Sequence, residues 1–263
     1  MTNKIFDKLF FLGALTLGDN FVYSGIVHHF AEKTNELYIP IELKFFNTIN
    51  TLYQDYNNII VVGFTHPQQE QDFIFKNNIS KISSEGMFNF NSEIQYGTAQ
   101  KENVNSCVVP LWDMQAYDHF ELPFSMRYKN FKLPKYVEGS DELYNRLSDL
   151  QPYILVHRHT GAGTSPIDIN AYRAINNLPD QYKVIEIDES ITDDMMNYIK
   201  LIENAKEIHV APSSFFCLVD SMLDRTNALL FYHNIRANTL MRVNSKWNNY
   251  RWNIVEYEYA RKI

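Results

Sequence analysis

Residues suited to binding an anion follow one buried-looking strand. The apolar run Tyr153–Val156 leads into a turn that is basic and contains glycine. Such a turn offers backbone N–H groups and cationic side chains to a phosphate, with little side-chain bulk in the way. It matches neither G-x-G-x-x-G nor G-x-x-x-x-G-K-[ST], so it names no cofactor. The turn is either a phosphate-binding loop or a tight turn that ends a core strand, and its candidate residues are His157, Arg158, His159, Thr160, Gly161 and Gly163.

A second candidate anion site follows another apolar strand. Ser213 and Ser214 separate the run Glu207–Ala211 from a predicted helix. Their hydroxyls and the first free N–H groups of that helix suit a phosphate, although serine also caps helices in general. Both strand ends belong to one predicted sheet, and a diphosphate has two charges to place. The pair of sites therefore favours a nucleotide diphosphate.

Charged residues near these strand ends complete the predicted site. His233 and Arg236 come after a strand expected to end at Tyr232, where they would add positive charge to the rim; Arg236 is otherwise a solvated surface residue. Glu186 and Asp188 lie at the end of another predicted strand, which comes between the two anion sites in chain order. A carboxylate there accepts hydrogen bonds from ribose hydroxyls or from a base edge. We rank an acidic metal motif lower, because these carboxylates precede a helix, and we expect no metal and no cofactor.

A carboxylate in the first half of the chain is the candidate general base. Asp19 lies with Gly18 and Asn20 in the first strand-to-helix loop. If the two halves face each other, Asp19 points into the cleft and takes a proton from an acceptor hydroxyl. Its alternative role is to cap the helix. Gly18, Asn20 and His66, which follows a later strand, are the predicted acceptor contacts.

Strands and helices that alternate along the chain must position these residues. In the first half, apolar runs at residues 10–15, 37–41 and 59–62 predict strands, with helical stripes between them. The second half alternates in the same way, whereas residues 65–105 have no clear period and 107–110 resemble a short strand. The pattern predicts an α/β fold of two Rossmann-like, doubly wound domains that face each other across a cleft. We place the N-terminal domain at 1–135 and the C-terminal domain at 136–263; the resemblance described below implies that the first binds an acceptor and the second a nucleotide-sugar.

Composition limits the location and the partners. The chain has 263 residues and a formal charge of -7, which disfavours a broad surface for nucleic acid or an anionic membrane. The apolar run Leu9–Leu15 is far shorter than a membrane span. Cys107 and Cys217 are far apart and match no zinc spacing, so reduced thiols are expected. These features favour a cytoplasmic protein.

Three segments together resemble glycosyltransferases of the GT-B fold, and heptosyltransferase-like enzymes in particular. They are Leu17-Gly18-Asp19 at the start of a helix, Tyr153–His157 before a glycine turn, and Leu201–Ile208 followed by Pro212-Ser213-Ser214. The resemblance implies two Rossmann-like domains, a nucleotide-sugar donor held mainly by the C-terminal one, metal-independent transfer and an acidic base from the N-terminal one. On this chain it makes Asp19 the base and gives the donor phosphate to Ser213 and Ser214.

The sequence thus predicts an inverting, metal-independent glycosyltransferase that moves a sugar from a nucleotide-sugar donor to a glycan or another hydroxyl acceptor. Two alternatives stay open. One is a nucleotide- or sugar-binding protein with the same two-domain cleft and no transfer. The other is a phage-type transferase that glycosylates DNA bases, which would need a basic groove despite the acidic total charge.

Overall fold

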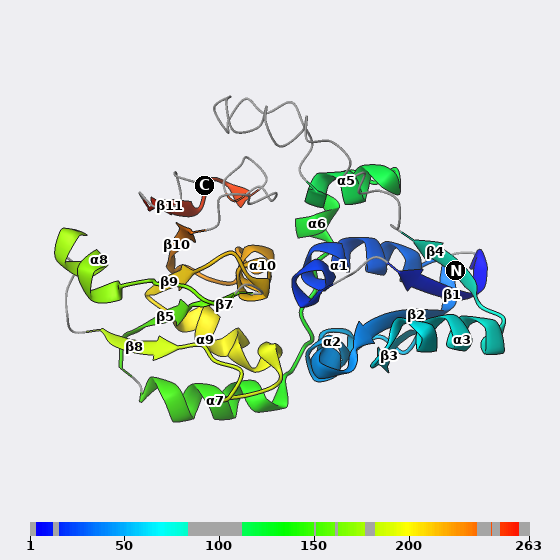
Figure 1. Cartoon of the computed structure of the whole chain (residues 1–263), viewed down its shortest axis with the longest axis horizontal. Coiled ribbons are helices and arrows are strands. Elements are labelled where there is room, and N and C mark those ends of the chain that lie inside the picture. Colours follow the sequence, from blue (N-terminus) through cyan, green and yellow to red (C-terminus); the bar gives the residue numbers. More distant parts are fainter. Residues whose placement is uncertain are drawn as a thin grey trace.

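Two parallel sheets form two lobes that lie side by side (Figure 1). The computed structural model describes residues 4–12, 16–83, 112–149, 151–160, 163–176, 182–235, 243 and 248–257. The N-terminal sheet has strand order β3-β2-β1-β4 and the C-terminal sheet has β11-β10-β9-β5-β8. Every strand pair in these two sheets is parallel, so in each sheet the carboxyl ends of all strands meet at one edge. This is the edge where open α/β sheets bind ligands.

The N-terminal lobe alternates strands and helices as the apolar pattern predicts. Its first helix begins at Leu17 and is buried along most of its length, because the sheet, α6 and the other lobe surround it. The elements are β1 (Phe6–Leu12), α1 (Leu17–Ala31), β2 (Thr34–Glu42), η1 (Leu43–Phe45), α2 (Phe46–Tyr53), β3 (Ile59–Phe64), α3 (Pro67–Asn77) and β4 (Ser80–Ser83).

The chain then crosses to the C-terminal lobe, whose first strand is wholly apolar until its last residue. Strand β5 is buried at all five positions, as expected of a strand covered on both faces of a parallel sheet. The crossing elements are α5 (Trp112–His119), α6 (Met126–Lys129) and α7 (Glu138–Ser148). The lobe itself contains β5 (Tyr153–His157), β6 (His159–Thr160), β7 (Gly163–Thr164), α8 (Ile169–Asn176), β8 (Lys183–Glu186), η3 (Met195–Tyr198), α9 (Ile199–Asn204), β9 (Glu207–Val210), α10 (Ser214–Ser221), β10 (Leu229–Asn234) and β11 (Trp252–Glu256).

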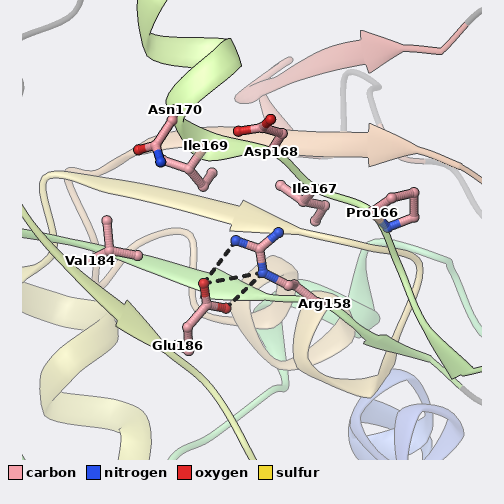
Figure 2. A pocket seen from close by; sticks show the side chains of 8 residues that line it. All are labelled: Arg158, Pro166, Ile167, Asp168, Ile169, Asn170, Val184 and Glu186. Atoms are coloured by element: carbon pink, nitrogen blue, oxygen red, sulfur yellow. Dashed lines mark hydrogen bonds and ion pairs between the residues drawn. The ribbon is translucent and has the colours of Figure 1, made fainter.

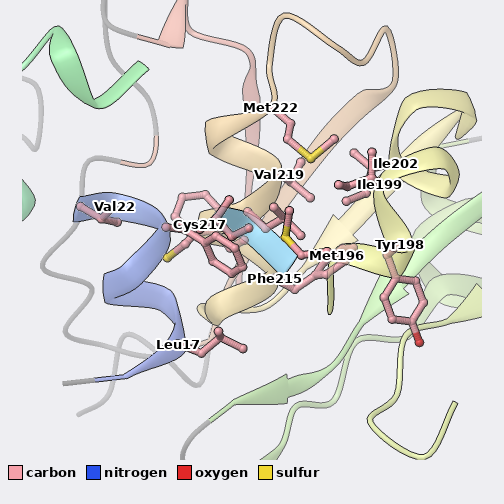
Figure 3. Close-up of a cluster of buried hydrophobic side chains, with 14 of the residues drawn as sticks. Leu17, Val22, Met196, Tyr198, Ile199, Ile202, Phe215, Cys217, Val219 and Met222 are labelled. Carbon is pink, nitrogen blue, oxygen red and sulfur yellow. The ribbon is translucent and has the colours of Figure 1, made fainter. Parts of the chain in front are cut away.

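The lobes share one hydrophobic core where α1 packs against α10 (Figure 3). Leu17 and Val22 of α1 belong to the same buried cluster as Phe215 and Val219 of α10. Close approach of the helices depends on Gly18, because a Cβ there would lie 3.2 Å from Cys217 Sγ and 3.3 Å from the Ser214 Cα. The contact places the beginnings of the two helices next to each other.

A buried ion cluster reinforces the contact between the lobes. Arg127 of α6 donates to Asp113 at 2.5 Å and to Asp220 of α10 at 2.6 Å, and all three side chains are completely buried. Asp220 also accepts hydrogen bonds from Tyr128 and from the Trp252 indole N–H. The α5–α6 segment is thereby tied to the C-terminal end of α10.

Several predicted element boundaries were wrong by a few residues. The first strand begins at Phe6 rather than at residue 10, residues 13–15 lie outside the described residues, and the strand expected to end at Tyr232 continues to Asn234. Strand β11 was not predicted. It is an edge strand, and asparagine and glutamate interrupt the apolar residues of Trp252–Glu256. The expected strand at 107–110 and most of the irregular 65–105 segment lie outside the described residues. The division at residue 135 stays a prediction.

Among the described helices, none combines the length and the apolar character that a membrane crossing requires.

Candidate functional site

The two predicted anion sites meet at the carboxyl edge of the C-terminal sheet. Strands β5 and β9 are neighbours, and His157 at the end of β5 hydrogen-bonds through Nδ1 to the Ser213 hydroxyl over 3.0 Å. Ser213 is the N-cap of α10, since its oxygen also accepts from the Phe216 N–H. Ser213 therefore caps α10, and it also lies next to the end of β5, as the two-site prediction requires. Whether a phosphate binds there stays a prediction.

His157 differs from the expected cationic side chain. It is only 7% exposed and its ring stacks on Phe215, with centroids 5.2 Å apart. Burial lowers its pKa to about 4, and the nearby His159 lowers it further while Asp188 opposes the shift. His157 is therefore neutral at pH 7 and orients Ser213 instead of supplying positive charge.

The beginnings of α1 and α10 bring the predicted base close to the predicted phosphate site. Gly18 packs on Ser214, the first residue of α10, so Asp19 follows directly after the contact. Gly18 and Asn20 are buried, and Asn20 donates its amide to the Thr16 carbonyl. Contact of these two residues with an acceptor stays a prediction. Asp19 itself is half-buried, and its Oδ2 accepts the Thr16 N–H over 2.6 Å in a capping interaction.

The glycine turn after β5 is a small hairpin. His159 and Thr160 pair with the segment Gly163–Thr164, and Gly163 has a φ of +112°, which favours glycine. His159 also lies 3.1 Å from a carboxylate oxygen of Asp188. The backbone N–H of Ser190 donates to Asp188 and is the main cause that lowers the pKa of Asp188. The Ser190 side chain lowers it further. Gly161 lies outside the described residues.

Arg158 and Glu186 line a pocket of about 480 Å³ beside α8 (Figure 2). Arg158 holds Glu186 in a bidentate pair, with Nη2–Oε1 at 2.8 Å and Nε–Oε2 at 2.9 Å. Strand β8, which carries Glu186, is the edge strand next to β5, so it does not lie between the two anion sites in space. The remaining lining residues mix apolar and polar groups: Pro166, Ile167, Asp168, Ile169, Asn170 and Val184.

His233 does not lie on the rim of the site. It is a strand residue of β10, is completely buried, and hydrogen-bonds to His209 and to the Tyr257 hydroxyl. Burial lowers its pKa to about 3, so it adds no positive charge. The strand was predicted too short because the polar His233-Asn234 pair looked like its end. Arg236 lies outside the described residues.

His66 lies in the N-terminal lobe, away from the strand that precedes Asp19. It follows β3, is exposed, and begins α3, where its backbone N–H approaches Gln69 Oε1 at 3.4 Å. Strand β2 separates β3 from β1 in the sheet. Contact of His66 with an acceptor stays a prediction.

Sequence reasoning missed two groups of residues. One is the segment Pro166–Asn170, which lines one side of the pocket and whose pattern gives no sign of that role. The other is a buried polar chain that includes Glu207 and His209. Its signal was present, because two polar residues at alternate positions of an apolar strand point to the same face of the sheet.

Comparisons with known proteins agree with the fold. No protein-family profile and no curated protein matches the chain. Among solved structures, a glycosyl transferase of family 9 from Veillonella parvula DSM 2008 aligns with a TM-score of 0.53 at 10% identity, covering 100% of this chain and 89% of that one. The E. coli ADP-heptose lps heptosyltransferase II aligns with a TM-score of 0.55 at 11% identity, covering 94% and 90%. These structures are GT-B glycosyltransferases, so the predicted fold and the heptosyltransferase-like resemblance of that fold are confirmed.

Proposed function

We propose that this protein is a glycosyltransferase that moves a sugar from a nucleotide-sugar donor to a hydroxyl acceptor. The observation that supports it most is the meeting of three elements in a GT-B fold: the ends of β5 and β9, joined through His157 and Ser213, and the start of α1 with Asp19. A diphosphate needs hydrogen-bond donors and a positive field, and the first N–H groups of a helix supply both.

The donor has a defined place in this proposal. Its diphosphate binds at the start of α10, where Ser213 and Ser214 add hydroxyls to the free N–H groups. Its nucleoside occupies the pocket lined by Arg158 and Glu186, where the carboxylate accepts hydrogen bonds from ribose hydroxyls or from a base edge. Because Arg158 already neutralises Glu186, the pocket suits an uncharged nucleoside better than a phosphate.

The reaction then needs a base and stabilisation of the leaving diphosphate. Asp19 takes the proton of the acceptor hydroxyl, whose oxygen attacks the anomeric carbon in an inverting displacement. The N–H groups at the start of α10 stabilise the charge that develops on the departing diphosphate, and this transfer needs no metal.

Calorimetry tests donor binding. Because the E. coli neighbour is named for ADP-heptose, ADP and ADP-sugars come first in a panel that also includes UDP, GDP, CDP and dTDP forms. We expect one of the nucleotides to bind, with weaker affinity in Ser214→Ala. Silence across the whole panel would contradict the proposal.

Asp19→Asn tests the base. The asparagine side-chain oxygen still accepts the Thr16 N–H, so the variant keeps the capping box and the fold. We expect turnover to fall by about 10²- to 10⁴-fold, the usual contribution of a general base, while nucleotide affinity stays unchanged. Transfer at the parental rate would show that Asp19 only caps α1.

A binding protein without transfer activity is the alternative that one observation favours. The carboxylate of Asp19 already accepts a backbone N–H, as in any capped helix. This alternative predicts nucleotide-sugar affinity with no sugar released to any acceptor or to water, which an assay for free nucleotide diphosphate measures directly.

A further inference from the structure

A chain of hydrogen bonds runs across β9, β10 and the end of β11, from the amino ends of these strands to their carboxyl ends. Glu207 Oε2 lies 3.1 Å from His209 Nε2, His209 Nδ1 lies 2.9 Å from His233 Nε2, and His233 Nδ1 lies 2.7 Å from the Tyr257 hydroxyl. Glu207 is 5% exposed and both histidines are completely buried. The aromatic rings of Tyr172 and Phe231 pack against His209 and keep water from it.

The chain ends where ligands of this fold bind. Glu207 is the first residue of β9, and Tyr257 comes directly after β11. Because the strands are parallel, Tyr257 lies at the same carboxyl edge as His157 and the segment that begins α10. The four side chains therefore connect a buried carboxylate at the amino edge with a half-buried phenol at the ligand-binding edge.

The donors and acceptors in this chain have one consistent order. A carboxylate only accepts, so His209 donates through Nε2 and is left with Nδ1 as an acceptor. His233 must then donate through Nε2, and its Nδ1 accepts the phenolic proton of Tyr257. Burial lowers the pKa of both histidines, so neither ring carries a charge in this arrangement. Each link already holds a proton that points toward Glu207.

We propose that Glu207, His209, His233 and Tyr257 form a proton relay through which Tyr257 takes a proton from a ligand hydroxyl. The ligand O–H bond breaks and its proton joins Tyr257 Oη, while the Tyr257 proton moves to His233 Nδ1. The Nε2 proton of His233 moves to His209 Nδ1, and the Nε2 proton of His209 moves to Glu207. Both imidazoles stay neutral throughout, and one proton is gained by the buried carboxylate.

The identity of the hydroxyl rests on the proposed function. If a sugar is transferred, the electron pair left on the acceptor oxygen forms the bond to the anomeric carbon, and the bond from that carbon to the diphosphate breaks with its pair on the leaving oxygen. Asp19 and the relay are then rival destinations for this one proton, and the Asp19→Asn and Glu207→Gln variants show which of the two receives it. Tyr257 is the group that contacts the ligand, and the other three are positioning and proton-storing residues.

Glu207→Gln separates proton transfer from mere positioning. The glutamine carbonyl still accepts from His209, so the chain keeps its geometry but can no longer store a proton. With the donor identified by calorimetry, we expect kcat to fall by about 10²-fold or more with KM unchanged, and Tyr257→Phe to do the same. Glu256→Gln, one residue before Tyr257 but bonded to Asn234 instead, is the matched control and should leave kcat unchanged. A parental kcat in Glu207→Gln overturns the proposal.

Nitrogen NMR of labelled histidines tests the relay without any substrate. We expect His209 and His233 to be neutral at pH 7 with the proton on Nε2 in both rings. An imidazolium, or a ring protonated on Nδ1 alone, overturns the relay. If no nucleotide binds but the NMR result is as expected, the proposed function fails and the relay stands; if transfer occurs with the opposite tautomers, the relay fails and the function stands.

Discussion

Among the arginines that pair with carboxylates in the described residues, Arg127 and Arg158 differ in their surroundings. Arg127 binds Asp113 and Asp220 between the lobes with no exposed surface, whereas Arg158 binds Glu186 in an open pocket and keeps 25% of its side chain exposed. Desolvation opposes the charge on Arg127, but the surrounding Tyr128, Asp220 and Asp113 outweigh it and raise its pKa above the usual range. The buried arginine holds the lobes together, and the exposed one is available to a ligand.

This difference has an energetic basis. A buried charge that loses its partner has no water to replace it, so breaking such a pair is costly. An exposed pair exchanges its partner for water at little cost. We therefore expect substitutions at Arg127 to affect stability and substitutions at Arg158 to affect binding.

The largest effect is expected from Arg127→Met. Methionine fills much of the volume but leaves the buried carboxylates of Asp113 and Asp220 without the charge of Arg127, so the free energy of unfolding should fall by about 3–5 kcal/mol. Urea denaturation measures it. Adding Asp113→Asn and Asp220→Asn to the same chain removes the uncompensated charges and should restore part of the loss. If Arg127→Met is as stable as the parent, the cluster does not hold the lobes together.

Acid should produce the next largest effect for a single side chain, and it tests whether burial governs a group that can change its charge. Burial lowers the pKa of His28 and of His157 to about 4. The unfolded chain, with a histidine pKa near 6.5, takes up protons first as the pH falls. Stability is therefore complete above about pH 6.5 and is lost toward pH 4, by about 3 kcal/mol for each of these histidines.

Urea denaturation at a series of pH values measures this loss. His28→Gln keeps a donor for the Asn130 carbonyl and should make the loss shallower by the share of one histidine. Stability that does not change between pH 6.5 and 4 would contradict the burial of these rings.

The smallest expected change in stability comes from Arg158→Gln. Loss of this half-exposed pair should cost at most about 1 kcal/mol. Nucleotide affinity, in contrast, should fall about tenfold, which corresponds to 1.4 kcal/mol of binding free energy. Lys183→Gln breaks another exposed pair on β8, with Asp149, outside the pocket, and is the matched control. Equal affinity in the two variants would mean that Arg158 does not face the nucleotide.

Local pattern predicted those parts of the fold that depend on short stretches of chain. The apolar run Tyr153–Val156 is a buried strand, and Ser213 caps the helix after β9, as their residue types indicate. Where polar residues occur inside a strand, the same reasoning failed, as at His233, because periodicity cannot tell a strand end from a strand that carries buried polar groups. The pairing of Glu186 with Arg158 was also missed, since nothing in one strand identifies its neighbour in the sheet.

The sequence alone determined the alternation of strands and helices, and with it the two parallel sheets and the edge where open α/β sheets bind ligands. Those features follow from apolar periodicity and from short-range capping, which are written into consecutive residues. Only the tertiary structure decided which titratable side chains carry a charge and which partners the charged ones have. Burial leaves His157 and His233 neutral, Arg127 is used to join the lobes, and Asp19 lies at the contact between α1 and α10. Solvent exposure and partners set the charge of a side chain, and both come from segments far apart in the chain.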